Sequence, residues 1–421
     1  MKIGFFTDGY LPQPNGVATS VAASAKALRD RGHNVYIVAP KEPGYKDLEA
    51  GVFRLTSIKV SNRPPVRLSL SLPEKPLREV LKIDFDIIHG HDGGTSTLLG
   101  WEIAKLKNIP FVGTYHTLWN RYTHYILKGK LIRPKVMEVA SRVFASLCDY
   151  LVVPTKRVKE ELLTYGVRKP IVVIPSGLDL SLFKAAPKGF LRKKFGLGAK
   201  KKILLYVGRL GQEKSIDFLL EVFKEIFEKE KDVYLVLIGD GPERKNLEQL
   251  AKKLKIADET IFTGFIDSKK IPKVYADGDI FVYSSKTETQ GLVVVEALVS
   301  GLPVVALNDP AFQGVVENGK NGFLVSENSA EFANKIRQLL ADKELRDKFS
   351  STAKLAAKKF SAKETAEKLE LLYQKVIAEH RAKKFVKFRT KIADLRSFFD
   401  LTERMNKLKN IISSYSQMKG F

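Results

Sequence analysis

The chain has 421 residues, of which 44% are hydrophobic and 28% charged, a composition typical of a globular protein and unlike that of a disordered one. Its single cysteine, Cys148, excludes an internal disulfide and a thiolate cluster for zinc. The formal net charge of +24 predicts attraction to polyanions, whether nucleic acid, anionic lipid or a phosphorylated substrate.

The N-terminus, with Met1 and Lys2, leads directly into a strand-like stretch, without the apolar region of a signal peptide. The sequence contains no apolar run of about 18 residues or more, so a spanning helix is not expected. Together with the lone cysteine, these features favour a cytoplasmic protein.

The first half of the chain alternates short apolar runs with helical patterns, which predicts a parallel sheet built from strand–helix–strand units. Because the runs are almost continuously apolar, helices should cover both faces of this sheet. The expected helices include Val17–Arg31 and Thr95–Leu106. The expected strands are Lys2–Thr7, Asn34–Ala39, Val52–Ile58, Phe85–His89, Ile109–Thr114, Tyr150–Val153 and Ile171–Ile174.

The second half repeats this rhythm, with helices expected at Ser215–Lys229, Pro242–Lys255 and Leu292–Val299. The expected strands are Lys202–Val207, Tyr234–Ile238, Thr260–Thr263, Ile280–Tyr283, Pro303–Ala306 and Gly322–Val325. We therefore predict an α/β protein with two doubly wound, Rossmann-like parallel-sheet domains, at residues 1–175 and 176–360. The expected remainder is an amphipathic helix at 361–380 that crosses back to the first domain, and a basic helical tail at 381–421.

Two glutamates, Glu288 and Glu296, stand on either side of the boundary between a loop and a helix, with Gly291 between them. The glycine permits close approach of a ligand, and the first N–H groups of the helix would face that ligand. Glu296 could accept hydrogen bonds from both hydroxyls of a ribose, and Glu288 could hold a second sugar. The alternative is an ordinary helix N-terminus with acidic residues favoured by the helix dipole.

Arg209 and Lys214 follow the strand Lys202–Val207, at the end of a parallel strand where open α/β sheets bind ligands. Two cations there can neutralise a diphosphate and stabilise the charge that develops as it leaves. The alternative is a loop with solvated charges.

Two further candidates follow strands of the first domain. Gly16 opens a helix after the first strand and could provide a phosphate-binding turn, although a simple turn explains it equally well. His116 follows another strand and can donate to a phosphate or a sugar hydroxyl. His89 and His91 are interpreted as polar residues of a loop at a strand end. No spacing among the three histidines predicts a metal site. Asp84–Asp86 and Asp277–Asp279 look like metal-binding pairs of acids, but each precedes an apolar strand, and they are interpreted as turn and strand-boundary residues.

These motifs, in this order, resemble the group 1 family of retaining, nucleotide-sugar-dependent glycosyltransferases with the GT-B fold, over about the first 380 residues. The segment Glu288–Glu296 matches the family's pair of glutamates with seven intervening residues, and Gly208–Lys214 matches its diphosphate-binding loop. Gly239–Pro242 and Pro175–Asp179 are further family landmarks. The family usually has Phe before the motif's glycine, where this chain has Gln290, which leaves the donor sugar open.

The resemblance implies that Glu296 holds the ribose and Glu288 the donor hexose, while Arg209 and Lys214 bind the diphosphate. It also implies transfer with retained configuration by departure and attack on one face of the sugar, with no catalytic metal and no cofactor. The leaving phosphate would take the acceptor's proton.

In the same comparison, Gly16 and the segment Gln290, Gly291 and Leu292 support the donor, and His116 lies beside the transferred sugar. His116, Glu288, Arg209 and Lys214 are therefore the expected catalytic residues.

A narrower likeness, in Tyr115–Thr117 and Tyr122–Pro134, is to bacterial diacylglycerol glucosyltransferases. It implies transfer of glucose from UDP-glucose to a membrane lipid such as diacylglycerol, on the inner face of the plasma membrane. Basic and aromatic residues suit an anionic membrane surface, at about 1 kcal/mol for each cation. The acceptor or membrane residues expected here are Trp119, Arg121, Tyr122, Tyr125, Lys128, Lys130 and Arg133. The apolar stripe Ile132, Val136, Val139, Ala140, Val143 and Leu147 is expected in the core. The basic tail after His380 is a second candidate for binding an anionic membrane surface, and whether it binds a membrane or a partner stays open.

Other functions remain alternatives. They are a glycosyltransferase with a soluble acceptor, a sugar-nucleotide 2-epimerase on the same fold, and a nucleic-acid-binding protein that uses the basic, Phe-containing tail. No specific nucleic-acid partner is expected, because no recognised reader motif is present. The number of sugars added and the oligomeric state stay open.

Overall fold

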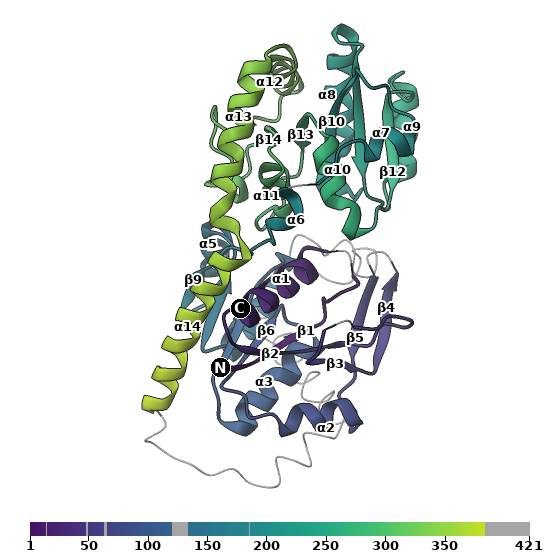
Figure 1. Ribbon diagram of the computed structural model, residues 1–421. Helices are drawn as coiled ribbons and strands as arrows, with labels where there is room; N and C mark the ends of the chain where they lie inside the picture. The colour runs from purple at the N-terminus through teal and green to yellow at the C-terminus, as the bar shows by residue number, and fades with distance from the viewer. Residues whose placement is uncertain (14, 48, 63–64, 120–133, 185, 384–421) are drawn as a thin grey trace. The chain divides into compact units, whose positions relative to one another are not determined.

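The computed structural model describes residues 1–13, 15–47, 49–62, 65–119, 134–184 and 186–383. It divides into two compact units, one formed by Met1–Pro175 with the chain from Thr365 onward, the other by Ser176–Glu364. Each unit has its own parallel sheet, as the sequence predicted (Figure 1).

The first unit contains a seven-stranded sheet with the order β3-β2-β1-β6-β7-β8-β9, and all of its pairings are parallel. Its strands are β1 Lys2–Thr7, β2 Asn34–Pro40, β3 Val52–Leu55, β6 Ile87–His91, β7 Phe111–Thr114, β8 Tyr150–Val153 and β9 Ile171–Val173. Its helices are α1 Gly16–Asp30, α2 Lys75–Lys82, α3 Thr95–Lys107, α4 Pro134–Leu147 and α5 Lys156–Thr164. The strand order reverses between β1 and β6, which makes the ends of these two strands the expected position of a ligand.

The predicted single strand Val52–Ile58 is wrong, because the chain leaves the main sheet after β3. At this point the N–H and the hydroxyl of Thr56 both donate to the carboxylate of Glu74, each at 2.7 Å. The chain continues as β4 Ser57–Asn62, which pairs antiparallel with β5 Pro65–Ser69 in a separate two-stranded sheet.

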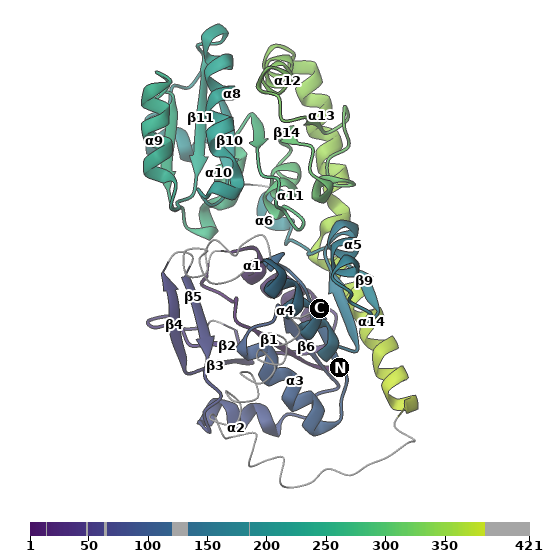
Figure 2. The same cartoon turned by 180° about the vertical axis from the view of Figure 1, so that it is seen from behind.

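The helix α14, Ala362–Lys383, packs against the first unit, as expected for a helix that crosses back (Figure 1). Its buried side chains recur at helical spacing and are Ala362, Thr365, Ala366, Leu369, Leu372, Tyr373 and Val376. Polar contacts fix its orientation, since Arg31 of the first unit forms ion pairs with Glu367 at 3.0 Å and Glu370 at 2.6 Å. Figure 2 shows this helix from behind.

The second unit contains a six-stranded parallel sheet with the order β12-β11-β10-β13-β14-β15. Its strands are β10 Lys202–Val207, β11 Val233–Ile238, β12 Thr260–Gly264, β13 Ile280–Tyr283, β14 Val304–Leu307 and β15 Gly322–Val325. Its α-helices are α6 Ser181–Lys184, α7 Phe190–Phe195, α8 Ile216–Lys229, α9 Arg244–Lys253, α10 Ile271–Asp277, α11 Leu292–Val299, α12 Ser329–Ala341 and α13 Lys343–Ala356. The order reverses between β10 and β13, and the strands that form this point are almost fully buried.

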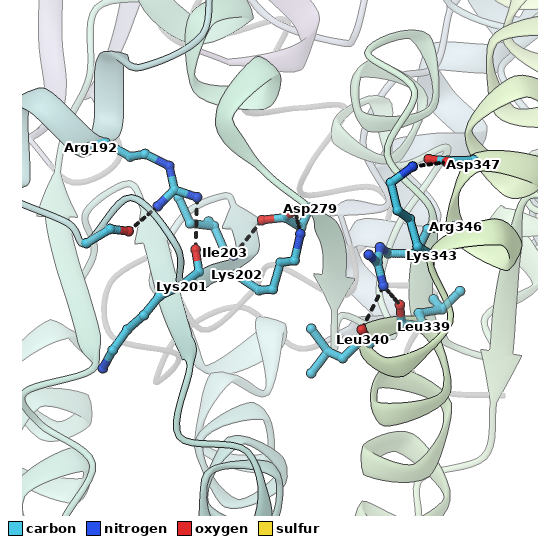
Figure 3. A network of polar contacts seen from close by, with 11 residues as sticks. Arg192, Lys201, Lys202, Ile203, Asp279, Leu339, Leu340, Lys343, Arg346 and Asp347 are labelled. Atoms are coloured by element: carbon cyan, nitrogen blue, oxygen red, sulfur yellow. Dashed lines mark hydrogen bonds and ion pairs between the residues drawn. The ribbon is translucent and has the colours of Figure 1, made fainter.

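Charged side chains bind backbone groups where β10 and β13 begin and, separately, at the end of α12 (Figure 3). Asp279 accepts hydrogen bonds from the Lys202 ammonium at 3.0 Å and from the N–H of Ile203 at 2.9 Å. In the same view Arg346 donates to the Leu340 carbonyl at the end of α12, at 2.7 Å. Asp279 thus lies at a strand boundary, as expected, and joins two neighbouring strands.

Asp277, the other acid of that segment, accepts from the N–H groups of Gly189 and Leu191. In the first unit Asp86 accepts from the N–H of Lys2 at 2.7 Å. These acids hold backbone segments together. Among the described residues, no helix is long and apolar enough to cross a membrane.

Candidate active site

The strand ends at the reversal point of the second sheet hold a buried ion pair. Lys214, in the short 3₁₀ turn Gln212–Lys214 after β10, donates from its ammonium to Glu288 in the loop after β13. Tyr283, the last residue of β13, donates its hydroxyl to the same carboxylate oxygen at 2.8 Å. Lys214 is only 7% exposed, so the contact forms largely out of water. The pair joins the loops that follow β10 and β13, the neighbouring strands between which the strand order reverses, and a ligand is expected at this point.

These contacts keep Glu288 ionised. Burial alone would raise its pKa, but the positive charge of Lys214 and hydrogen bonds from Lys214, Tyr283 and Ser285 outweigh burial and lower the pKa below its usual value. An ionised carboxylate accepts hydrogen bonds only, so Glu288 can receive the hydroxyl groups of a sugar. Lys214 has three N–H donors, and its ammonium contacts Ser285 Oγ at 3.5 Å as well as Glu288.

Arg209 lies two residues beyond β10 and is held by Glu213, with 3.0 Å between its Nη2 and the carboxylate. The Arg209 side chain stays 27% exposed, whereas that of Glu213 is 3% exposed. The loop that holds Arg209 packs directly on the loop after β11. A Cβ on Gly239, which has a φ of +128°, would lie 2.0 Å from the Gly208 carbonyl oxygen. The glycine landmark at residues 239–242 therefore has a packing reason.

Gly291 is the N-cap residue directly before the helix α11 and has a φ of +69°, in the left-handed region that favours glycine. A Cβ at this position would lie 2.5 Å from the ring of Phe312, so space also excludes a side chain. Leu292 is the first residue of α11 and is partly buried. The turn into α11 thus depends on both the backbone angle and the aromatic neighbour.

Glu296, in the second turn of α11, accepts a hydrogen bond from the hydroxyl of Tyr275 at 2.8 Å. Burial raises the pKa of Glu296 to about 7, and the hydrogen bond from Tyr275 offsets part of this shift. The carboxylate therefore gains stability from any ligand that donates hydrogen bonds to it, as the two hydroxyls of a ribose would.

Gln290, expected to support the donor, is 2% exposed and faces the backbone of Ser176. Its carbonyl oxygen accepts from the Ser176 N–H at 2.8 Å, and its amide donates to the Ser176 carbonyl at 2.9 Å. The side chain therefore binds protein on both sides.

In the first unit, Gly16 is the first residue of α1 and is exposed. The preceding residue, Asn15, caps the helix, and its side-chain oxygen accepts from the N–H of Ala18 at 2.9 Å. The side chain of Asn15 therefore occupies one of the N–H groups that a phosphate could use.

The expectation that His89 and His91 lie in a loop is wrong, because β6 extends to His91 and both residues are buried. Their rings stack with 4.3 Å between centroids, and the ring of His116 stacks on His91 at 5.3 Å. We call these three residues the histidine stack. His116 follows β7, which lies next to β6, so adjacent strand ends bring the rings together. Burial lowers the pKa of all three histidines, that of His89 to about 3, that of His116 to about 4 and that of His91 well below its usual value, so the stack is neutral.

Sequence reasoning missed Asp92, the residue after β6, which has a φ of +56°. Its carboxylate accepts from the N–H of His116 at 2.7 Å and from the hydroxyl of Thr117 at 3.1 Å. Burial raises its pKa to about 7, and the hydrogen bonds from His116 and Thr117 counteract part of the shift. An acid that directly follows a buried strand at the reversal point was the available signal.

Part of the expected acceptor segment is visible. Trp119 is partly buried, and its ring packs against Tyr115 and Phe144, with centroids 5.1 and 6.0 Å away. The other expected residues lie outside the described residues, and they are Arg121, Tyr122, Tyr125, Lys128, Lys130 and Arg133. The tail is likewise outside them from residue 384 onward.

The prediction that the apolar stripe of the helix α4 lies in the core is wrong for Val136 and the stripe residues after it, while Ile132 lies outside the described residues. The buried residues of this helix are Ser141, Phe144 and Ala145, followed by Cys148 just beyond its end. The predicted stripe is one residue out of register with them, and Val136 is 41% exposed. Buried Ser141 explains the error, because its hydroxyl lies 2.7 Å from that of buried Tyr115 and so satisfies a polar residue in the core.

The structure thus brings Lys214 and Glu288 into contact within the second unit, with Arg209 in the same loop as Lys214. Glu296 lies in the same unit on α11, while Gly16 and His116 belong to the first. In the ranges that the structure describes, no cluster of three or more His, Cys, Asp or Glu side chains could hold a metal ion.

Comparison with known proteins places these motifs in a family. Residues 187–356 match the family model described as glycosyl transferases group 1, and residues 14–182 match that of glycosyltransferase family 4. The alpha-monoglucosyldiacylglycerol synthase of Streptococcus pneumoniae is 35% identical over 332 residues, which cover 77% of this chain and 75% of that protein. The enzyme of the same name from Acholeplasma laidlawii is 29% identical over 395 residues, 91% of this chain and 99% of its own.

Solved structures agree on the fold. Sucrose-phosphate synthase from Thermosynechococcus elongatus matches with a TM-score of 0.70 and 24% identity, over 90% of this chain and 100% of its own. The HepE protein of Anabaena in complex with UDP-glucose matches with a TM-score of 0.69 and 22% identity, over 91% and 100%. The two parallel-sheet units are therefore those of the GT-B fold.

Proposed function

Because this chain belongs to the group 1 glycosyltransferases, we propose that it transfers glucose from UDP-glucose to a lipid acceptor such as diacylglycerol, with retained configuration. The observation that supports the donor half is the Lys214–Glu288 pair at the reversal point of the second sheet, with Arg209 beside Lys214 in the chain. The ammonium of Lys214 can bind a diphosphate, and the adjacent carboxylate of Glu288 can accept hydrogen bonds from a sugar, so the pair suits a ligand in which the two are joined.

The chemistry follows from these groups. The bond between the anomeric carbon of the sugar and the β-phosphate oxygen breaks, and the acceptor's hydroxyl oxygen forms the new bond on the same face. The departing phosphate takes the hydroxyl proton. Arg209 and Lys214 stabilise the charge that gathers on the diphosphate, and we propose that these two cations make a metal ion unnecessary. Glu288 positions the hexose through its hydroxyls, and Glu296 binds the ribose.

The acceptor half rests on two kinds of support. The two relatives described above carry the name of a diacylglycerol-modifying enzyme. The first unit also exposes apolar side chains next to a cation in the sequence, since Ile58 and Val60 of β4 are 49% and 52% exposed and stand on either side of Lys59. Apolar side chains next to cations, in a chain of formal charge +24, suit an anionic membrane surface. We therefore propose peripheral binding to such a surface.

A transfer assay tests this function. The full chain is incubated with a panel of radiolabelled sugar nucleotides and vesicles that contain diacylglycerol and an anionic lipid, and lipid is then extracted into organic solvent. We expect label from UDP-glucose in the organic phase and an α-linked product by NMR. Lys214→Met should abolish transfer, whereas the matched variant Lys224→Met, at an exposed lysine paired with Glu228, should not.

The alternatives give different results in the same assay. Label that stays in water on a new acceptor indicates a soluble acceptor, and a changed free sugar nucleotide indicates an epimerase. Absence of any transfer, together with steeply salt-dependent binding to random DNA, would indicate a nucleic-acid-binding protein and would overturn the proposal.

A further inference from the structure

The contact between His91 and His116 joins a buried histidine to the one expected beside the sugar. His91 Nδ1 lies 3.0 Å from His116 Nε2, and the two rings are inclined by only 23°. His91 is 4% exposed and is the last residue of β6. One hydrogen bond therefore connects the sheet to the His116 ring.

Because both rings are neutral, a single proton lies between the two nitrogens. A neutral imidazole carries its proton on one nitrogen and accepts at the other. Either His91 donates from Nδ1 to His116, or His116 donates from Nε2 to His91. If His91 donates, its Nε2 is unprotonated and His116 Nδ1 carries a proton. If His116 donates, His91 Nε2 carries a proton and His116 Nδ1 is unprotonated.

The surroundings of His91 Nε2 decide between these two arrangements of the proton. His91 Nε2 is buried and has no hydrogen-bond partner in the described part of the chain. If His116 donated, this nitrogen would carry a buried N–H without an acceptor, which is rarer in proteins than an acceptor without a donor. The arrangement in which His91 donates leaves only a bare nitrogen there.

We propose that His91 is a positioning residue that donates its Nδ1–H to His116 and so holds His116 in the tautomer protonated at Nδ1. His116 then presents an N–H donor at Nδ1, which makes no hydrogen bond with any described residue. Building on the proposed function, we infer that the partner of this donor is an oxygen of the bound donor, either a hexose hydroxyl or a phosphate oxygen. His116 acts on that oxygen as a hydrogen-bond donor.

The position of the His116 ring does not depend on His91 alone. The N–H groups of His116 and Thr117 are both held by Asp92, at 2.7 and 3.3 Å. Replacement of His91 should therefore change where the proton lies more than where the loop lies.

NMR of the full chain, labelled with ¹⁵N at histidine, tests the tautomer without any substrate. Spectra of His91→Asn and His116→Gln assign the signals among the six histidines. We expect His116 Nδ1 to show the shift of a protonated nitrogen and Nε2 that of an unprotonated one. The reverse pattern, or a mixture of both in the wild-type chain, would overturn the proposal whatever the catalytic activity.

Kinetics test the consequence for transfer. His91→Phe keeps a ring in the stack but removes the donor, and we expect kcat to fall by about tenfold to a hundredfold, the size of loss found when the hydrogen-bond partner of a metal-bound histidine is removed. His91→Asn places an amide donor near the Nδ1 position and should restore both the tautomer and most of the turnover. His380→Phe on α14, which removes a ring nitrogen bonded to the Asn108 carbonyl at the end of α3, is the matched control.

Equal losses in His91→Phe and His91→Asn, with the tautomer unchanged in both, would show that His91 acts through packing only and would contradict the proposal. A wild-type chain that transfers no sugar would instead contradict the proposed function, while the NMR result would still decide the tautomer.

Discussion

The side-chain amide of Gln290 binds both backbone groups of Ser176, its oxygen accepting from the N–H at 2.8 Å and its nitrogen donating to the carbonyl at 2.9 Å. Ser176 is the first residue of the second unit, and the residue before it, Pro175, accepts from the hydroxyl of Thr365 at 2.9 Å. The loop between the two glutamates is thus hydrogen-bonded to the segment where the chain passes between units. A Phe at residue 290 could not make this connection.

Replacement of Gln290 should loosen that segment. Gln290→Leu removes both hydrogen bonds at similar volume and leaves two buried backbone groups unpaired, so we expect a loss of about 2 kcal/mol or more in the free energy of unfolding. Hydrogen exchange at the Ser176 amide should accelerate. Gln249→Leu, at an exposed position of α9, serves as the control. An unchanged Ser176 exchange rate in Gln290→Leu would mean that this amide is protected by something other than Gln290.

The pair Lys214–Glu288 allows stability and function to be separated. Lys214→Met leaves Glu288 ionised and partly buried without its cation, which should lower the free energy of unfolding by about 3 kcal/mol. The double variant Lys214→Met/Glu288→Gln removes the unpaired charge and should recover most of that stability. Because both variants lack the cation, neither should bind UDP well by calorimetry.

Urea unfolding measures the first quantity and calorimetry the second. UDP affinity that recovers along with stability in the double variant would show that Lys214 serves the fold and not the diphosphate.

The strands of both sheets could be predicted because apolar runs of strand length occur between helical patterns, and β1, β8, β10, β13 and β15 have the expected bounds. The hairpin β4–β5 could not, because its departure from the sheet depends on Glu74, which lies 18 residues from Thr56. Local pattern carries no information on such a contact.

Sequence motifs likewise indicated which residues form the candidate site but not what each one touches. Lys214 and Glu288 follow two different strands, and only the strand order makes those strands neighbours. The partner of Gln290 is 114 residues away, so a side chain that suggests ligand binding in the motif binds backbone instead. Long-range pairing decides the roles of such residues, and spacing alone cannot supply it.

The shifted pKa of Glu296 predicts a pH dependence of nucleotide binding. Its folded-state pKa of about 7 lies above the usual 4.5, so the native chain retains this proton to higher pH than the unfolded chain. Hydroxyl donors favour the ionised form, and UDP should therefore bind more tightly as pH rises from about 6 to about 8. The variant Glu296→Gln should bind UDP more weakly and lose this part of the pH dependence. The pH dependence that comes from titration of the UDP phosphate should remain. An identical pH profile in both proteins, measured by calorimetry, would argue against titration of Glu296.

The raised pKa of Glu296 also predicts how the stability of the fold changes with pH. Because the folded state binds more protons between about pH 4.5 and 7, the free energy of unfolding should fall as pH rises through that interval. Glu296→Gln should remove this decline in urea unfolding experiments.

The hydrogen bond between Tyr373 of α14 and His89 of β6 is 2.6 Å long and fully buried. Tyr373→Phe keeps the ring but leaves His89 Nδ1 without its partner, at an expected cost of about 1–3 kcal/mol. For a unit of this size each kcal/mol lowers the melting temperature by roughly 2–4 °C.

Tyr150→Phe is the matched control, because its hydroxyl bonds the more exposed Glu379 at 3.1 Å and its loss should cost less. Since α14 is held to the first unit partly through this bond, the helix should also exchange amide hydrogens faster in Tyr373→Phe than in Tyr150→Phe. Equal melting temperatures for the two variants would mean that apolar contacts of α14 hold it in place and that the buried bond adds little.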